Sequence, residues 1–286
     1  MSNLTCVLSS YFVIVTCRNS ENNIEEALLS LRAQTVPPSY VIVIDDGSRD
    51  RTADILRQLQ SGWPSLHIIT NPDLGYNIAR VVSNWNKAIQ YTRDHRLPRT
   101  DYHMISTDDT VYERDYAEKM MRHMDADGKI AIASGNYEDK PAIAPHGGGR
   151  FVRTEFFDKH HGLYPEKMGY ESLVLYSATR HGYTFQVFDD ARFEHTRPLG
   201  KNHHFYEFGA SMRTLGYHPL FALGRFFLYF ASGKPTGRLG AIYMLYYYLS
   251  YKPKETGYDS MHDSEIRRYI RNYQFTRIKK KLGVPG

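Results

Sequence analysis

The chain has 286 residues, 42% of them hydrophobic, and carries a formal net charge of +5 with an isoelectric point near 9.0. This length and hydrophobic content predict a globular protein with a sizeable core. The two cysteines, Cys6 and Cys17, exclude a disulfide framework and suit a reducing compartment. The apolar run at residues 11–16 is too short and too β-branched for a signal-peptide core, so we expect a cytoplasmic protein.

The first half of the chain alternates short β-branched runs with helical patterns. Buried strands are predicted at residues 11–16, 40–45 and 66–69, and each precedes a helix, at residues 24–31, 52–60 and 78–91. Continuous apolar strands separated by helices predict an α/β fold with a mostly parallel sheet flanked by helices on both faces. In such a sheet, ligands bind beyond the carboxyl ends of the strands.

The second half begins with a predicted strand at residues 130–135, which a loop containing "HGGGR" follows. A helix is predicted at residues 170–181 and a strand near residues 185–188. From Lys201 onward the pattern is helical and rich in Tyr and Phe. We therefore expect a sheet domain over residues 1–200 and a helical C-terminal region over residues 201–286.

The C-terminal region contains the most apolar stretch of the chain. Gly233, Lys234, Pro235 and Arg238 interrupt it before it reaches the roughly 20 residues that a spanning helix needs, so no transmembrane helix is predicted. From Lys252 onward, nine Lys or Arg residues stand against four Asp or Glu residues, which favours anionic partners. The region either packs as a helical subdomain, the favoured interpretation, or makes a peripheral contact with anionic lipid at the inner face of the membrane.

Polar clusters follow the predicted strands as "TCRN", "DDGS" and "STDD". Together with "LGYNIARVVSNWNKAI" and the later "HTRP", these motifs resemble glycosyltransferase family 2 in content and order. The resemblance covers about residues 10–200. It implies the GT-A fold and an inverting enzyme that moves a sugar from a nucleotide diphosphate to an acceptor.

The resemblance also assigns residues to the nucleotide sugar. It implies that Asp46 in "DDGS" binds the nucleoside, with Thr16 and Asn19 from the first loop beside it. A carboxylate there can accept a hydrogen bond from an imide N–H or a ribose hydroxyl, whereas a plain turn is the alternative reading of "DDGS". Arg80 is expected to face the nucleotide, and Arg197 the phosphates.

The adjacent acids Asp108 and Asp109 should repel one another unless a cation lies near them. In the family, an Asp-x-Asp motif at this place binds Mg²⁺ or Mn²⁺ bridging the diphosphate. Ser106 stands at the first Asp position here, so we expect few protein ligands and weak metal binding without nucleotide. His195 is implied as a metal ligand or hydrogen-bond donor. The alternative for the acids is a helix-start cluster favoured by the helix dipole.

A base must take the proton of the acceptor hydroxyl in a single inverting displacement. "GYES" resembles an acid pair of the family whose second member serves as the base in many enzymes, but that position is Ser172 here. Glu171 is therefore the predicted base, with Asp158 or a base supplied by the acceptor as the alternatives.

The expected partners are a nucleotide-sugar donor, with UDP favoured, and a glycan, lipid-linked or other cell-surface acceptor. No nucleic-acid-binding module is recognised in the sequence, so no nucleic acid is expected. Two other functions remain open. One is a non-catalytic sugar-nucleotide binding protein, and the other is a haloacid-dehalogenase-like phosphatase, which "STDDTV" resembles although Ser106 occupies its nucleophile position.

Overall fold

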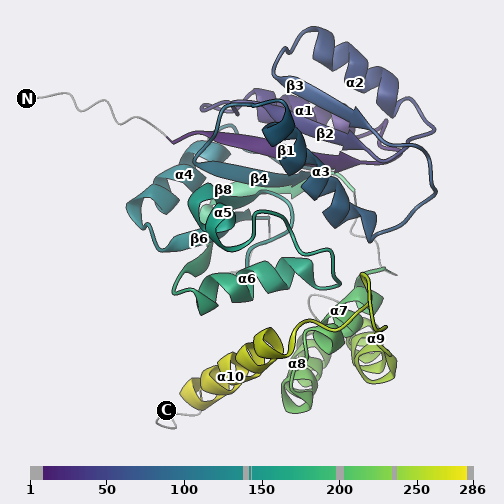
Figure 1. The fold of residues 1–286 in the computed structure, drawn as a ribbon, viewed down its shortest axis with the longest axis vertical. Coiled ribbons are helices and arrows are strands. Elements are labelled where there is room, and N and C mark those ends of the chain that lie inside the picture. The colour runs from purple at the N-terminus through teal and green to yellow at the C-terminus, as the bar shows by residue number, and fades with distance from the viewer. Residues whose placement is uncertain (1–8, 138–141, 143, 198–202, 234–236, 282–286) are drawn as a thin grey trace, which may run out of the picture. The chain divides into compact units, whose positions relative to one another are not determined.

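The computed structural model describes residues 9–137, 142, 144–197, 203–233 and 237–281 (Figure 1). The chain forms two compact units: unit 1 comprises Met1–Tyr164 and Ser177–Pro198, and unit 2 comprises Pro165–Tyr176 and Leu199–Gly286. Of the sequence features discussed above, Cys6 and the Lys234–Pro235 break lie outside the described residues. Cys17 is a free, buried thiol.

Unit 1 contains an eight-stranded sheet with the strand order β3-β2-β1-β4-β7-β6-β8-β5. Strands β1, β2, β3 and β4 run parallel, as do β6 and β8, whereas β7 and β5 are antiparallel to their neighbours. The strands are β1 Tyr11–Cys17, β2 Val41–Asp45, β3 Leu66–Thr70, β4 Tyr102–Thr107, β5 Thr110–Tyr112, β6 Ile130–Asn136, β7 Arg150–Arg153 and β8 Thr184–His195.

Helices cover the sheet and continue through unit 2 (Figure 1). They are α1 Ile24–Arg32, α2 Thr52–Ser61, α3 Arg80–Asp94, α4 Tyr116–Ala126, α5 Thr154–His160, α6 Tyr170–Arg180, α7 His203–Thr214, α8 Pro219–Ser232, α9 Gly237–Ser250 and α10 Ser264–Lys281. Helix α6 begins in unit 2 and ends in unit 1. The predicted mostly parallel α/β sheet and the helical C-terminal extension are confirmed.

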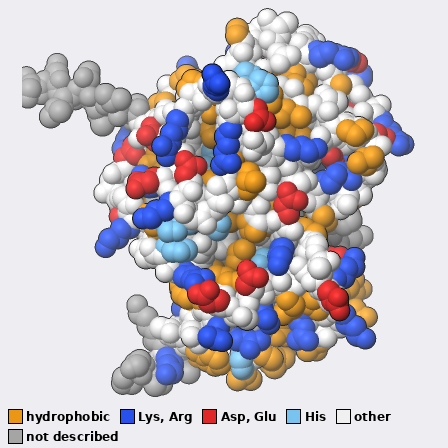
Figure 2. Space-filling view, in the orientation of Figure 1, with side chains coloured by type: hydrophobic (Ala, Val, Ile, Leu, Met, Phe, Trp, Pro, Cys, Tyr) orange, Lys and Arg blue, Asp and Glu red, His pale blue; other side chains and the backbone are white. Residues whose placement is uncertain are grey.

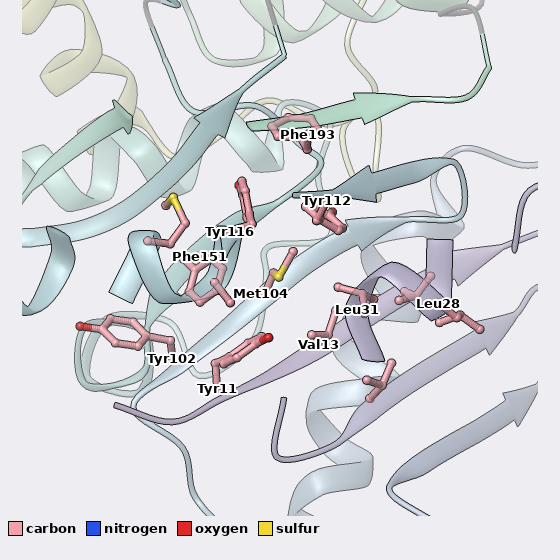
Figure 3. Close-up of a cluster of buried hydrophobic side chains, with 14 of the residues drawn as sticks. Tyr11, Val13, Leu28, Leu31, Tyr102, Met104, Tyr112, Tyr116, Phe151 and Phe193 are labelled. Carbon is pink, nitrogen blue, oxygen red and sulfur yellow. The ribbon is translucent and has the colours of Figure 1, made fainter. Parts of the chain in front are cut away.

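The core of unit 1 lies on both faces of the sheet. Alternate residues of β1, such as Val13 and Val15, pack with Leu28 and Leu31 of α1 and with side chains of α2 and α4 (Figure 3). Phe12 and Ile14, which alternate with them, are also buried, and α3 contacts β1 and β2. Burial on both faces explains why these strands read as continuous apolar runs rather than alternating ones.

The main departures from the predicted elements lie in the second half of the sheet. Strands β5 and β7 and helices α4 and α5 are not among the predictions, and β8 extends from Thr184 to His195 instead of ending near residue 188. β5 and β7 have three and four residues, and their pairing with β8 and β6 joins distant parts of the chain. Such short segments carry too little periodicity to be recognised from sequence.

Unit 2 is helical in its described residues. Its core includes Met212 and Leu215 from α7 and the turn that follows it, Met244 and Tyr248 from α9, and Ile270 from α10. Helix α8 begins at Pro219 after an N-cap interaction of His218, and it ends at Gly233, which adopts a left-handed conformation with φ 67°. Within the described residues, no helix is both long enough and apolar enough to cross a membrane.

Candidate functional site

The carboxyl ends of three neighbouring strands bring the predicted motifs together. Strands β2, β1 and β4 are adjacent and parallel, so the segments that follow them meet at one edge of the sheet. In the loop after β1, Arg18 donates hydrogen bonds to the carbonyl oxygens of Asp46 and Gly47, and Ser20 donates through Oγ to Asp108. The loop between β1 and α1 therefore contacts both the "DDGS" and the "STDD" segments.

Asp46 is buried and lies in a network of polar side chains. The guanidinium of Arg80 pairs with it, with Nε 3.0 Å and Nη2 2.8 Å from Oδ2, and Asn71 donates to Oδ1 at 3.1 Å. Asn71 also donates to Asn84 and accepts from Lys87. Burial favours the neutral carboxyl, but the hydrogen bonds from Arg80 and Asn71 outweigh it and lower the pKa of Asp46.

The structure places the other predicted nucleotide residues around this network. Thr16 lies near the end of β1 and pairs in register with Ile44 and Thr107. Asn19 adopts φ 50° and accepts a hydrogen bond from the backbone N–H of Arg49 at 2.8 Å. Both residues belong to the same edge as Asp46.

The "DDGS" turn is held by contacts of its own. Asp45 accepts hydrogen bonds from Ser48 N at 2.9 Å and from Ser48 Oγ at 2.6 Å, and so supports the turn. Gly47 has φ 73°, and a Cβ atom there would come within 2.5 Å of the backbone of Asp73. Only glycine lets this turn pack against the loop that carries Asp73.

The two adjacent acids are compensated by a guanidinium. Arg197 contacts Asp108 through Nη2 and lies 3.4 Å from Asp109 through Nε. His195 Nδ1 is 3.4 Å from Asp109 Oδ1 and 3.3 Å from the hydroxyl of Thr110. The structure thus gathers Asp108, Asp109, His195 and Arg197, which are far apart in the sequence, into one cluster.

The pKa values of the two acids shift in opposite directions, although burial raises both. Burial raises the pKa of Asp108, and the negative charge of Asp109 adds to this, although Arg197 and Ser20 act in the opposite direction. Burial also disfavours ionised Asp109, but hydrogen bonds from His195 and Thr107 lower its pKa to about 2. Asp109 therefore remains ionised over the whole neutral range.

The donor atoms of this cluster suit a hard divalent cation, because they are carboxylate oxygens and an imidazole nitrogen. Within the described part of the chain, no group of three or more His, Cys, Asp or Glu side chains is arranged to hold a metal ion. Arg197 shows that the acids attract a cation. The cluster fits an ion whose coordination is completed by a ligand better than an ion held by protein groups alone.

Ser106 does not face this cluster. It is buried, and its hydroxyl lies 2.8 Å from that of Tyr112. The side chain that does support the acids is Thr107, which donates to Asp109 Oδ1 at 2.7 Å. Sequence reasoning missed Thr107, because its contact with Asp109 is formed by the turn that joins β4 to β5.

The "HGGGR" loop reaches the acid cluster through its backbone. A Cβ atom on Gly148 would lie 3.1 Å from Thr110 Oγ1 and 3.3 Å from His195 Cε1. Gly149 has φ 71° and its carbonyl accepts a hydrogen bond from Tyr116 at 2.6 Å. The glycines therefore allow the backbone to approach the side chains of Thr110 and His195 closely.

The two predicted bases lie in different places. Glu171 belongs to unit 2. There the burial of the Glu207 side chain, and secondarily the negative charge of Glu171, raise the pKa of Glu207 to about 7. Asp158 belongs to unit 1 and pairs with Arg99 at 2.9 Å, just before β4 begins. The structure thus places Asp158 at the amino end of β4, away from the acids at its carboxyl end.

Comparison with known proteins decides the family. The model of glycosyl transferase family 2 matches residues 12–192, which is more than half of the chain. The chain belongs to this family. The predicted enzyme class is thereby confirmed at the level of family 2, and the match rules against the haloacid-dehalogenase-like alternative.

Similarity to individual family 2 proteins is partial. Glycosyltransferase AglE of Haloferax volcanii is 35% identical over 68 residues, which are 23% of this chain and 22% of that protein. Poly-beta-1,6-N-acetyl-D-glucosamine synthase of Staphylococcus aureus is 24% identical over 123 residues, 43% of this chain and 27% of that protein. The chain thus matches about a quarter of the length of these relatives.

The fold extends beyond these local matches. The mannosyltransferase PcManGT of Pyrobaculum calidifontis, solved with GDP-Man and Mn²⁺, superimposes with a TM-score of 0.59 at 15% identity. The superposition covers 98% of this chain and 77% of that one. At this identity the likeness concerns the fold, and it confirms the GT-A architecture expected of family 2.

Proposed function

We propose that the protein is an inverting, metal-dependent glycosyltransferase that moves a sugar from a nucleotide diphosphate, most favourably UDP, to a glycan, lipid-linked or other cell-surface acceptor. The contact of one loop with two sites carries this proposal: Arg18 touches the Asp46 segment and Ser20 touches Asp108. A nucleoside at the first site and a diphosphate at the second would then lie along the same sheet edge. A cytoplasmic location is part of the proposal, and the free thiol of Cys17 suits a reducing compartment.

The donor is proposed to bind first through its nucleoside. Asp46 can accept hydrogen bonds from an imide N–H or ribose hydroxyls, because Arg80 and Asn71 keep it ionised. Thr16 and Asn19 would line the same place. Arg80 would then share its positive charge with the diphosphate, to which guanidinium groups bind well.

Asp108, Asp109 and His195 are proposed to hold Mn²⁺ or Mg²⁺ once the diphosphate is present. Such an ion would supply positive charge to the leaving diphosphate. Asp109 is the principal ligand, because its pKa of about 2 keeps it ionised. Arg197, already paired with both acids, would contact the phosphates beside the ion.

Glu171 is proposed as the base that takes the proton of the acceptor hydroxyl. It lies in the first turn of α6. Ser172, at the position of the usual acid, cannot serve unaided, since a hydroxyl is too weakly basic near neutral pH. This substitution is also what favours the second candidate, a sugar-nucleotide binding protein without transferase activity.

The two candidates are separated by measuring nucleoside diphosphate release from UDP-, GDP- and dTDP-sugars with Mn²⁺ or Mg²⁺ and a panel of acceptors. Glu171→Gln should retain UDP binding while transfer falls by about 10² to 10⁴, as for loss of a general base. Glu255→Gln, at an exposed glutamate, is the matched control. Unchanged transfer in Glu171→Gln would place the base elsewhere, and UDP binding without release in the wild type would favour the binding protein.

A further inference from the structure

The outward face of helix α8 is apolar along its whole length. Over these 14 residues, all of them described, Arg225 is the one charged side chain, and its guanidinium lies over the rings of Tyr217, Phe221 and Tyr229 at 5.8 to 5.9 Å. The large exposed side chains of α8 are Leu220, Leu223, Phe227, Leu228 and Phe230. Leu220, Leu223, Phe227 and Phe230 follow one another at intervals of three and four residues, so they form one stripe, and Leu228 widens it on one side.

Helix α9 repeats this arrangement. Its 14 residues, also fully described, contain one charged residue, Arg238, in the first turn. Its large exposed side chains again recur at helical spacing, and they are Leu239, Ile242, Tyr243, Tyr246 and Leu249. Two of them, Leu239 and Leu249, are more than 60% exposed.

Both helices are therefore hydrophobic on two sides. Their inward sides supply Ala222, Met244 and Tyr248 to the core of unit 2, and the two helices pack against each other. A helix at the surface of a water-soluble protein usually turns a polar side outward, and large exposed apolar patches mark binding surfaces. In Figure 2, hydrophobic side chains reach the surface among Lys and Arg in the lower region of the view, where Figure 1 draws these helices.

We propose that α8 and α9 form a membrane-binding hairpin that inserts its outward face into the surface of an anionic bilayer. Each helix has 14 residues, so each is about 21 Å long, too short for a hydrocarbon core of about 30 Å. The hairpin therefore lies in one leaflet rather than crossing both. This inference concerns unit 2 alone, and it gives the proposed lipid-linked acceptor a physical route to the enzyme.

The charge of the region favours an anionic lipid surface, rather than a second copy of the chain, as the partner of α8 and α9. Residues 199–286 contain fourteen Lys or Arg and five Asp or Glu. Two copies meeting through α8 and α9 would bring two strongly basic regions together, whereas anionic headgroups would neutralise them. The exposed rings of Tyr243 and Tyr246 also suit a boundary where one end of the side chain is apolar and the other is wet.

Vesicle flotation tests the proposal on the full chain. The wild type should float with phosphatidylcholine vesicles that contain roughly a third phosphatidylglycerol, and more weakly with phosphatidylcholine alone. The double variant Phe227→Glu, Leu239→Glu should lower the bound fraction by about tenfold or more. Leu29→Glu, at an exposed leucine of α1 in unit 1, should bind as the wild type does.

Insertion is distinguished from surface attraction by a fluorescent reporter. The two tryptophans, Trp63 and Trp85, are buried in unit 1, so Phe227→Trp adds an exposed probe on α8. Its emission should shift to the blue and be quenched by lipids brominated on the acyl chains, whereas Leu29→Trp should show neither change. Circular dichroism and light scattering of each variant report folding and oligomeric state. Failure of the wild type to float, or a dimer that the double variant dissociates, would overturn the proposal.

Discussion

At the scale of single residues, Arg197 answers why two acids stand side by side after β4. Its guanidinium pairs with Asp108 and Asp109, so the like charges are compensated before any ion arrives. A divalent cation binding to the same carboxylates must compete with this contact. Arg197 would therefore weaken the proposed metal binding when no nucleotide is present, and a diphosphate that draws Arg197 away would strengthen it.

Arg197→Ala should consequently raise the affinity for Mn²⁺ in the absence of nucleotide. Because the arginine is 42% exposed, the gain should be modest, up to about fivefold. Isothermal titration calorimetry with Mn²⁺ measures it, and Arg99→Ala, at an arginine before β4, is the control. Equal or weaker Mn²⁺ binding in Arg197→Ala would contradict the competition. The same variant should reduce the gain in UDP affinity that Mn²⁺ provides.

Motif recognition predicted several site residues and missed the side chains that hold them. The structure gathers Asp46 with Arg80, and Asp109 with His195, as the motifs imply. Asn71, Asn84, Lys87 and Thr107 were not singled out, because their contacts depend on packing between elements. Two of them were within reach of the sequence: Asn84 and Lys87 follow Arg80 by four and seven residues, so they share its side of α3.

At the scale of elements, the loop between β6 and β7 positions the end of β8. Gly148 leaves little room beside His195 and Thr110, because a Cβ atom added to it would lie 3.3 and 3.1 Å from their side chains. A methyl group there must displace one of these side chains by a few tenths of an ångström. The loop therefore controls the position of the imidazole that faces Asp109.

Gly148→Ala should disturb the His195–Asp109 contact while the fold persists. We expect UDP affinity in the presence of Mn²⁺ to fall by about threefold to tenfold, with little change in EDTA, since a lost hydrogen bond contributes about 1 kcal/mol. Calorimetry under both conditions measures this. Gly128→Ala, where a Cβ atom meets nothing within 4 Å, is the matched control. A fall of equal size in EDTA would place the effect outside the metal cluster.

The strands differ in whether their own sequence or their neighbours stabilise them. β1 and β2 are buried along nearly all their length, so the apolar run alone predicted them. β8 mixes exposed, intermediate and buried residues, and its pairing shifts register twice along β6. Such a strand is stabilised by its neighbours rather than by its own pattern, which is why its full length was not predicted.

At the scale of the whole molecule, the basic residues and an acid with a raised pKa are concentrated in one part of the chain. The basic excess lies after residue 199, and unit 2 also holds a half-buried acid, Glu207, whose buried Oε1 atom has no hydrogen-bond partner among the described residues. Burial, and secondarily the charge of Glu171, raises the pKa of Glu207 to about 7. The folded chain thus retains a proton that the unfolded chain releases near the ordinary value of 4.5.

This difference makes the stability of the protein depend on pH. Between about 4.5 and 7 the folded state binds more protons at Glu207 than the unfolded state, so the free energy of unfolding falls as pH rises through that window. Above it the full cost of ionising a buried carboxyl is present, at most about 3 kcal/mol. Glu207→Gln keeps the shape of the side chain and removes the titration.

Glu207→Gln should therefore gain stability relative to the wild type as pH rises, with the largest gain near pH 8 and little near pH 5. Urea unfolding, followed by far-ultraviolet circular dichroism at several pH values, measures the difference in the free energy of unfolding. Groups whose pKa values the substitution leaves unchanged contribute equally to both proteins, so their titration cancels in this difference. Glu255→Gln, at an exposed glutamate of unit 2, should show no such trend. A stability difference that stays constant from pH 5 to 8 would show that Glu207 is ionised in the folded protein.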